Sequence, residues 1–194
     1  MNKVKYGLKN VHAAKLTETF AEGVTTYTYD TPKRIPGAVN MSLDAEGESN
    51  PFYADNIVYF RSTTNNGYSG DLEIALVPEW FREEILKETK DSKGVFIERS
   101  DIGEPVHFAL LFEFDGDEKA IRHVLYNCSV SGRPSVSSQT KEAGVEPVTE
   151  TLSLSADPRS DGLVKARSGS ETTAATYQAW YNAVYTPTES NQGG

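Results

Sequence analysis

Only a few short segments of this chain carry residue types that could bind nucleotides or metals. The stretch Gly67-Tyr68-Ser69-Gly70 is glycine-rich, but it lacks the lysine of a phosphate-binding loop and the spacing of a dinucleotide fingerprint. Asp115-Gly116-Asp117-Glu118 resembles the start of a calcium loop, yet Ala120 stands where such a loop requires glycine. The sequence therefore predicts ordinary turns at both places, with no cofactor and no metal site.

The histidines and the single cysteine are also poor candidates for chemistry. His12, His107 and His123 are too scattered for a local metal motif. A hairpin could place His107 and His123 on neighbouring strands, and the register decides whether they share a face. Because Cys128 is the only cysteine, an intrachain disulfide is excluded. No predicted helix N-terminus lies near Cys128 to lower the pKa of its thiol. We expect packing histidines and an inert, half-buried thiol.

Carboxylates are the most abundant ionisable groups. The chain has 28 acidic and 19 basic residues, a formal net charge of -9. Two carboxylates in a cleft could act as acid and base, as in glycosidases, but most of these residues fall on the solvent side of alternating strands. We therefore expect no catalytic residues, and a protein that is not an enzyme. The acidic balance is the opposite of the basic footprint of proteins that grip DNA.

Length and composition favour one folded domain. The 194 residues are 38% hydrophobic and 24% charged, which is typical of a globular chain. The longest apolar runs are far shorter than the roughly 20 residues of a membrane helix, so no membrane span is expected. The polar residues that follow Tyr6 do not fit a signal peptide.

Alternating hydrophobicity predicts most of the secondary structure. Residues 24–29 are β-branched and aromatic, and residues 38–46 and 71–76 alternate strictly between apolar and polar side chains. Each of these last two strands should carry one apolar face and one polar face. The carboxylates expected on the polar faces are Asp44, Glu46, Asp71 and Glu73.

A hairpin and two helices complete the predicted core. Strands at 106–114 and 120–128 flank Asp115-Gly116-Asp117, where the glycine would supply a positive φ. Both faces of this hairpin are apolar, so another element or subunit should cover one of them. Pro78 begins an amphipathic helix of about three turns, and a second helix follows the cap-type residues 170–173.

The predicted organisation is an N-terminal arm over residues 1–22 with at most a short strand, a β domain over 23–185 and a disordered tail over 186–194. Residues 47–68 form a long loop, and residues 129–145 should be a mobile loop. The fold class is mainly β: an antiparallel β-sandwich or barrel with one or two flanking helices. A further strand is expected at residues 148–156.

Five ordered blocks resemble the major tail tube proteins of long-tailed bacteriophages (siphoviruses) of Gram-positive hosts. The resemblance runs from about Val4 to Tyr185 and is carried by the co-occurrence of the blocks. They are Ile35 to Glu48, Phe52-Tyr53-Ala54-Asp55-Asn56, Asn66 to Glu73, Phe112 to Asp117 and Arg122 to Cys128.

This resemblance implies a structural virion protein, made in the host cytoplasm, that self-assembles into stacked hexameric rings. The rings would form the conduit for genome ejection, through which DNA passes without specific binding. Asp44, Glu46, Asp71 and Glu73 would face an acidic lumen that repels DNA. Expected partners are further copies of the chain, a tape-measure protein, and a tail terminator or distal tail protein. Residues expected in the loop between rings are Asn50, Phe52, Tyr53, Asn65, Asn66 and Tyr68.

Two other classes of function stay open on the residues alone. The ten tyrosines would also suit a monomeric β-sandwich module that binds carbohydrate or a partner protein. An acidic hydrolase would need a cleft with paired carboxylates of perturbed pKa, and the sequence indicates no such pair.

Overall fold

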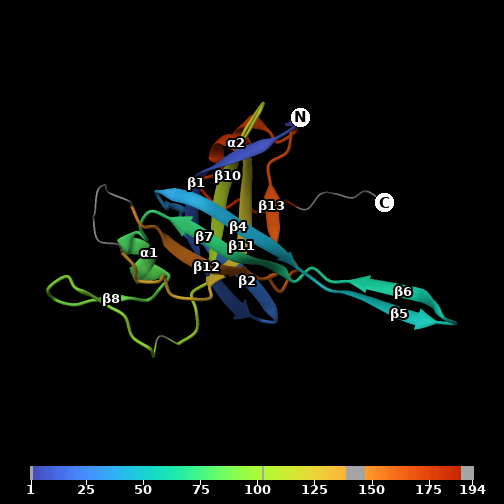
Figure 1. The fold of residues 1–194 in the computed structure, drawn as a ribbon, viewed down its shortest axis with the longest axis horizontal. Coiled ribbons are helices and arrows are strands. Elements are labelled where there is room, and N and C mark those ends of the chain that lie inside the picture. Colours follow the sequence, from blue (N-terminus) through green and yellow to red (C-terminus); the bar gives the residue numbers. More distant parts are fainter. Residues whose placement is uncertain (1, 102, 139–146, 189–194) are drawn as a thin grey trace.

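The structure is a computed structural model that describes residues 2–101, 103–138 and 147–188 (Figure 1). Its two helices are α1 (Glu79–Glu84) and α2 (Ala174–Ala179). Its strands are β1 (Lys5–Ala21), β2 (Val24–Tyr29), β3 (Lys33–Arg34), β4 (Ala38–Glu46), β5 (Ser49–Ala54), β6 (Ile57–Thr63), β7 (Gly67–Ile74), β8 (Thr89–Lys90), β9 (Phe96–Ile97), β10 (Phe108–Gly116), β11 (Ile121–Val130), β12 (Glu150–Ala156) and β13 (Lys165–Arg167).

Nine strands form one antiparallel sheet that folds over on itself. The order is β2-β1-β10-β11-β12-β7-β4, with β13 paired to β11 and β3 to β1. Between β11 and β12 only three residue pairs are in register, from Cys128↔Ala156 to Val130↔Leu154. The sheet turns there, so that β4, β7 and β12 cross over β10 and β11 (Figure 1). The predicted mainly β, antiparallel fold with flanking helices is confirmed, and the sheet stays open between the edges β2 and β4.

The prediction of an N-terminal arm is wrong. Lys5–Ala21 is a 17-residue strand that pairs with both β10 and β2, and Val11 and Ala13 lie in the core. The register with β10 shifts twice, and Asn10 in the second shift has a φ of 51°. These irregularities break the two-residue period, which explains why the sequence does not read as a strand.

The β10–β11 hairpin is present, but its turn differs from the predicted one. Gly116 belongs to β10 and is not among the residues with positive φ. The chain bends at residues 117–119, after the end of β10. The N-terminus closes this turn: the Asn2 carboxamide oxygen accepts hydrogen bonds from the backbone N–H groups of Glu118 and Lys119, both at 3.0 Å. Lys3 N–H donates to Asp117 at 2.8 Å.

Each face of this hairpin is covered within the chain. Phe108, Leu110 and Phe112 point into the main core, between the two layers and next to α1. Ala109 and Leu111 point to the other side, where Trp180 and the residues after α2 cover them. Both helices have six residues, and α1 is shorter than the three turns predicted. α1 buries Phe81, whereas α2 buries no residue and the second face is covered by the residues after it. No described helix has the length and apolar character needed to cross a membrane.

The predicted long loop is a projecting hairpin of β5 and β6. It extends away from the sandwich (Figure 1) and turns at Asp55 and Asn56, which both have positive φ, as a tight hairpin turn requires. The predicted strand at residues 148–156 corresponds to β12. Of the predicted loop 129–145 and the predicted tail 186–194, residues 139–145 and 189–194 lie outside the described residues.

Candidate interaction surfaces

The four carboxylates predicted to face one way do share a surface, called here the carboxylate face. On β4 and β7, register partners are Ser42↔Asp71 and Asp44↔Ser69. Register partners in a sheet point to the same side, so Asp44, Glu46, Asp71 and Glu73 lie on one side of the outer layer. The alternate residues Met41 and Leu43 pack on the core. The structure places these carboxylates together; whether they line a lumen stays a prediction.

Hydroxyl groups hold most of these carboxylates in place. Ser153 on β12 donates to Asp71 at 2.7 Å, Ser69 donates to Glu46, and Thr149 donates to Glu73. Serine and threonine bind the carboxylates without neutralising their charge. The face therefore keeps its negative charge, while the Glu46, Asp71 and Glu73 side chains are held by the sheet.

The β5–β6 hairpin exposes large apolar side chains, called here the aromatic hairpin surface. Phe52 and Phe60 are register partners with 61% and 62% of their surface exposed. The other exposed apolar residues are Tyr53, Ile57, Val58 and Tyr59. A two-stranded hairpin is at best marginally stable alone in water, and contiguous exposed apolar side chains mark interaction sites. The exposed apolar side chains of this hairpin are therefore a candidate interaction site.

The residues predicted for the loop between rings divide into three groups. Asn50, Phe52 and Tyr53 are on β5, within the projecting hairpin. Asn65 and Asn66 are at its base, where Asn66 N–H donates to the Glu46 carbonyl at 2.8 Å. Tyr68 is on β7 and packs against the core, so its inclusion in the loop is wrong. Tyr68 follows Gly67, where alternation resumes and turns its side chain inward.

Tyr68 lines a cleft of about 360 Å³ between the two layers, a site that sequence reasoning missed. Its lining residues are Lys5, Met41, Ser42, Leu43, Tyr68, Phe112, Phe114, His123, Val124, Leu125 and Lys165. Five strands contribute cationic or aromatic groups, and these lie far apart in the sequence. No local spacing could have shown the cleft. It is called here the cationic cleft.

His123 is a half-buried ionisable group of this cleft. Its ring stacks on Phe112 with centroids 5.1 Å apart, and its Nε2 atom is buried without a hydrogen-bond partner. Burial, followed by the positive charges of Lys5, Lys165 and Arg167, lowers the pKa of His123 to about 4. The ring is neutral at pH 7 and resists protonation.

We expect acid to destabilise the fold through His123. An unfolded histidine takes up its proton near pH 6.5, whereas His123 in the fold does so only near pH 4. Between these values the unfolded chain binds more protons, so the free energy of unfolding falls as the pH is lowered through this window. Urea unfolding at pH 7.5 and 4.5 should show a smaller loss in His123→Phe than in the natural chain. An equal loss in both would contradict the assignment.

The remaining candidates for chemistry are tied up in packing. His107 pairs with Asn127 through Nδ1 at 2.7 Å, and His12 stacks on Tyr181 at 4.6 Å. His107 precedes the first residue of β10, whereas His123 on β11 pairs with Phe112, so the two histidines lie at separated points of the hairpin. Cys128 is fully buried, more than predicted, and burial raises the pKa of its thiol. Within the described ranges, no three His, Cys, Asp or Glu residues gather as metal ligands would.

Comparison of the sequence with protein-family models finds no match, and comparison with curated proteins finds none either.

Proposed function

We propose that this chain is the structural subunit of a bacteriophage tail tube, which self-assembles into stacked hexameric rings around a channel for the genome. The observation that carries the proposal is the aromatic hairpin surface: the hairpin extends away from its own sandwich, and its large apolar side chains are exposed. The order of the sequence blocks, from about Val4 to Tyr185, supports the phage assignment and the ring number.

Two further features support the proposal that copies of the chain assemble side by side. The edge strand β4 has nine residues and a hydrogen-bonding edge that no other described strand occupies. Such an edge is a template for pairing with another chain. The carboxylate face lies on the same strand and on its neighbour β7. Pairing of β4 with a sister subunit would extend this anionic face from copy to copy, and like charge would keep DNA from adhering to it.

Assembly of the purified chain tests the proposal. We expect negative-stain microscopy to show rings or tubes, and sedimentation to show particles much larger than 21.3 kDa at high protein concentration. Replacing the register partners Phe52 and Phe60 together by serine should shift the protein to the monomer, because both side chains lose their apolar contact with a neighbour.

The control variant is Phe20→Ser. Phe20 is 73% exposed, more than Phe52 or Phe60. If assembly were driven by non-specific hydrophobic contacts, replacing Phe20 should weaken it at least as much. We expect Phe20→Ser to assemble normally. A natural chain that stays monomeric at all concentrations would overturn the proposal and favour the monomeric module that binds carbohydrate or protein.

A further inference from the structure

The cationic cleft differs in charge from the rest of the molecule. The chain has a net charge of -9, yet the ionisable residues that line the cleft are Lys5, Lys165, His123 and Tyr68, with no carboxylate among the lining residues. Arg167 is the register partner of His123 and adds positive charge beside it. A concentration of positive charge in an acidic protein points to an anionic ligand.

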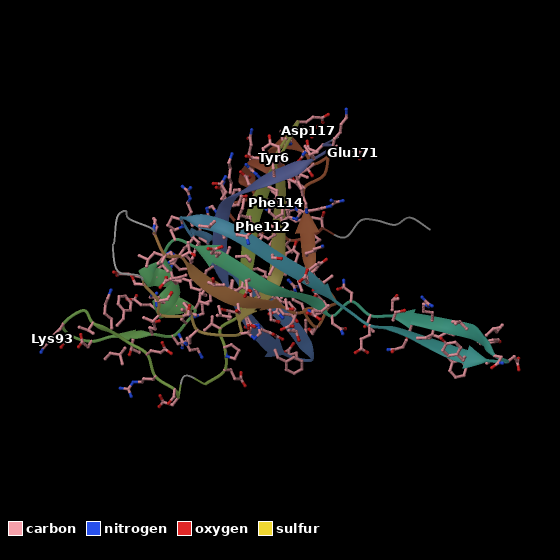
Figure 2. All side chains as sticks on the ribbon, viewed as in Figure 1. Tyr6, Lys93, Phe112, Phe114, Asp117 and Glu171 are labelled. Carbon is pink, nitrogen blue, oxygen red and sulfur yellow. The ribbon has the colours of Figure 1, made fainter. Side chains whose placement is uncertain are left out.

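The aromatic rings that line the cleft set a second requirement for its ligand, which should also have an apolar part. The Lys165 ammonium lies 4.2 Å from the centre of the Tyr68 ring and donates to its hydroxyl. The Lys5 ammonium lies 5.2 Å from the centre of Phe114, which follows Phe112 along β10 (Figure 2). An ammonium group has three donors, so each lysine can still bind a carboxylate. The ligand should therefore combine a carboxylate with an apolar body.

The tip of the β5–β6 hairpin has this combination. Asp55 is exposed at the turn, and the next residues along each strand include Tyr53 and Ile57, with 64% and 62% of their surface exposed. Two paired strands lie only about 5 Å apart, so a two-residue turn can enter a cleft of this size. Because the hairpin extends away from its own sandwich (Figure 1), the tip can enter only the cleft of another copy.

We propose that the cationic cleft binds the β5–β6 tip of a second copy of this chain, with the Asp55 carboxylate between the ammonium groups of Lys5 and Lys165. Ile57 then packs on the rings of Tyr68 and Phe114. The contact joins two different surfaces, so it is of the head-to-tail type that closes into rings or continues into filaments. This inference rests on the proposed self-assembly and names the two surfaces that make it.

Charge reversal tests the contact. We expect Asp55→Lys, and separately the pair Lys5→Glu with Lys165→Glu, each to raise the protein concentration needed for half-maximal assembly by about tenfold or more, because like charges then meet. A mixture of the two variants should assemble better than either alone, since the tip of one fits the cleft of the other. Lys93→Glu, which reverses an exposed lysine far from the cleft (Figure 2), should assemble like the natural chain.

The outcomes separate this inference from the proposed function. If the natural chain assembles and the reversed variants assemble equally well, the tip-and-cleft contact is wrong while the tail-tube proposal stands. If both variants are weakened but their mixture is not restored, the two surfaces bind elsewhere and the contact is again wrong. If the natural chain does not assemble at all, both proposals fail. Circular dichroism on each variant identifies any loss of assembly that comes from unfolding.

Discussion

Replacing Glu113 by alanine is expected to lower the free energy of unfolding by about 3 to 5 kcal/mol, the usual cost of removing one partner of a buried ion pair. Glu113 is 6% exposed and binds Arg122 Nε at 2.9 Å. The same carboxylate accepts a hydrogen bond from Asn10 at 2.7 Å and from Tyr181 at 3.1 Å. Alanine would leave three donors from separate parts of the chain without their acceptor.

The exposed ion pair of Lys33 and Glu84 is the matched control. It has a similar geometry, with an N–O distance of 2.5 Å, but its side chains are 46% and 38% exposed. Such pairs contribute about 0 to 1 kcal/mol, so Glu84→Ala should change stability little. Urea unfolding of both variants at pH 7 gives the comparison. Equal and small losses of stability in the two variants would show that Glu113 and its partners are open to water.

Replacing Trp180 by alanine should also cost about 3 to 5 kcal/mol, as large-to-small changes in a core do. Trp180 is 3% exposed and covers the second apolar face of the β10–β11 hairpin, with Leu111 and Val124 beneath it. Its ring stacks on Tyr185 with centroids 5.5 Å apart, and its indole N–H donates to the His123 carbonyl at 3.3 Å.

Trp180→Phe separates the two roles of this side chain. Phenylalanine keeps an aromatic ring over the face and loses the indole hydrogen bond, so we expect a clearly smaller loss than with alanine. Thermal unfolding followed by near-ultraviolet circular dichroism measures the loss of stability in both variants. A Trp180→Ala variant as stable as the natural chain would mean that another element covers Leu111.

The sequence predicted correctly those features that depend on a pattern within a single regular strand. The alternation of residues 38–46 and 71–76 placed Met41 and Leu43 correctly toward the core and the four carboxylates correctly on one face. The two apolar faces of residues 108–112 correctly indicated that a further element covers one of them. These patterns hold because a regular strand has a fixed period of two, whatever it packs against.

The failures occurred where the backbone is irregular or the contact is distant. In β1, the register shifts at Tyr6/Leu8 and Lys9/His12 interrupt the alternation of apolar and polar residues. The buried residues of this strand are also small or lie next to lysines, so the sequence shows no strand pattern. At the hairpin, the Asp-Gly pair indicated a turn too early in the chain, because Asn2 and Lys3, more than 100 residues away, stabilise a turn at residues 117–119.

The cationic cleft shows the same limit for a binding site. Lys5, Tyr68, His123 and Lys165 come from four strands, and only the folding-over of the sheet brings them together. Each of these residues alone looks like an ordinary surface or packing residue. Charge counted over the whole chain hid the local excess of positive groups, since the net charge is -9.

The narrow junction between β11 and β12 has a consequence for the shape of any wall built from this protein. Only three residue pairs tie the two layers there, so the side chains between the layers set the angle at which they meet. A bulkier or smaller side chain in this core, for example at Phe108 or Leu152, is therefore expected to change this angle. In the proposed tube, the volume of the subunit core would then help to set the diameter of the ring.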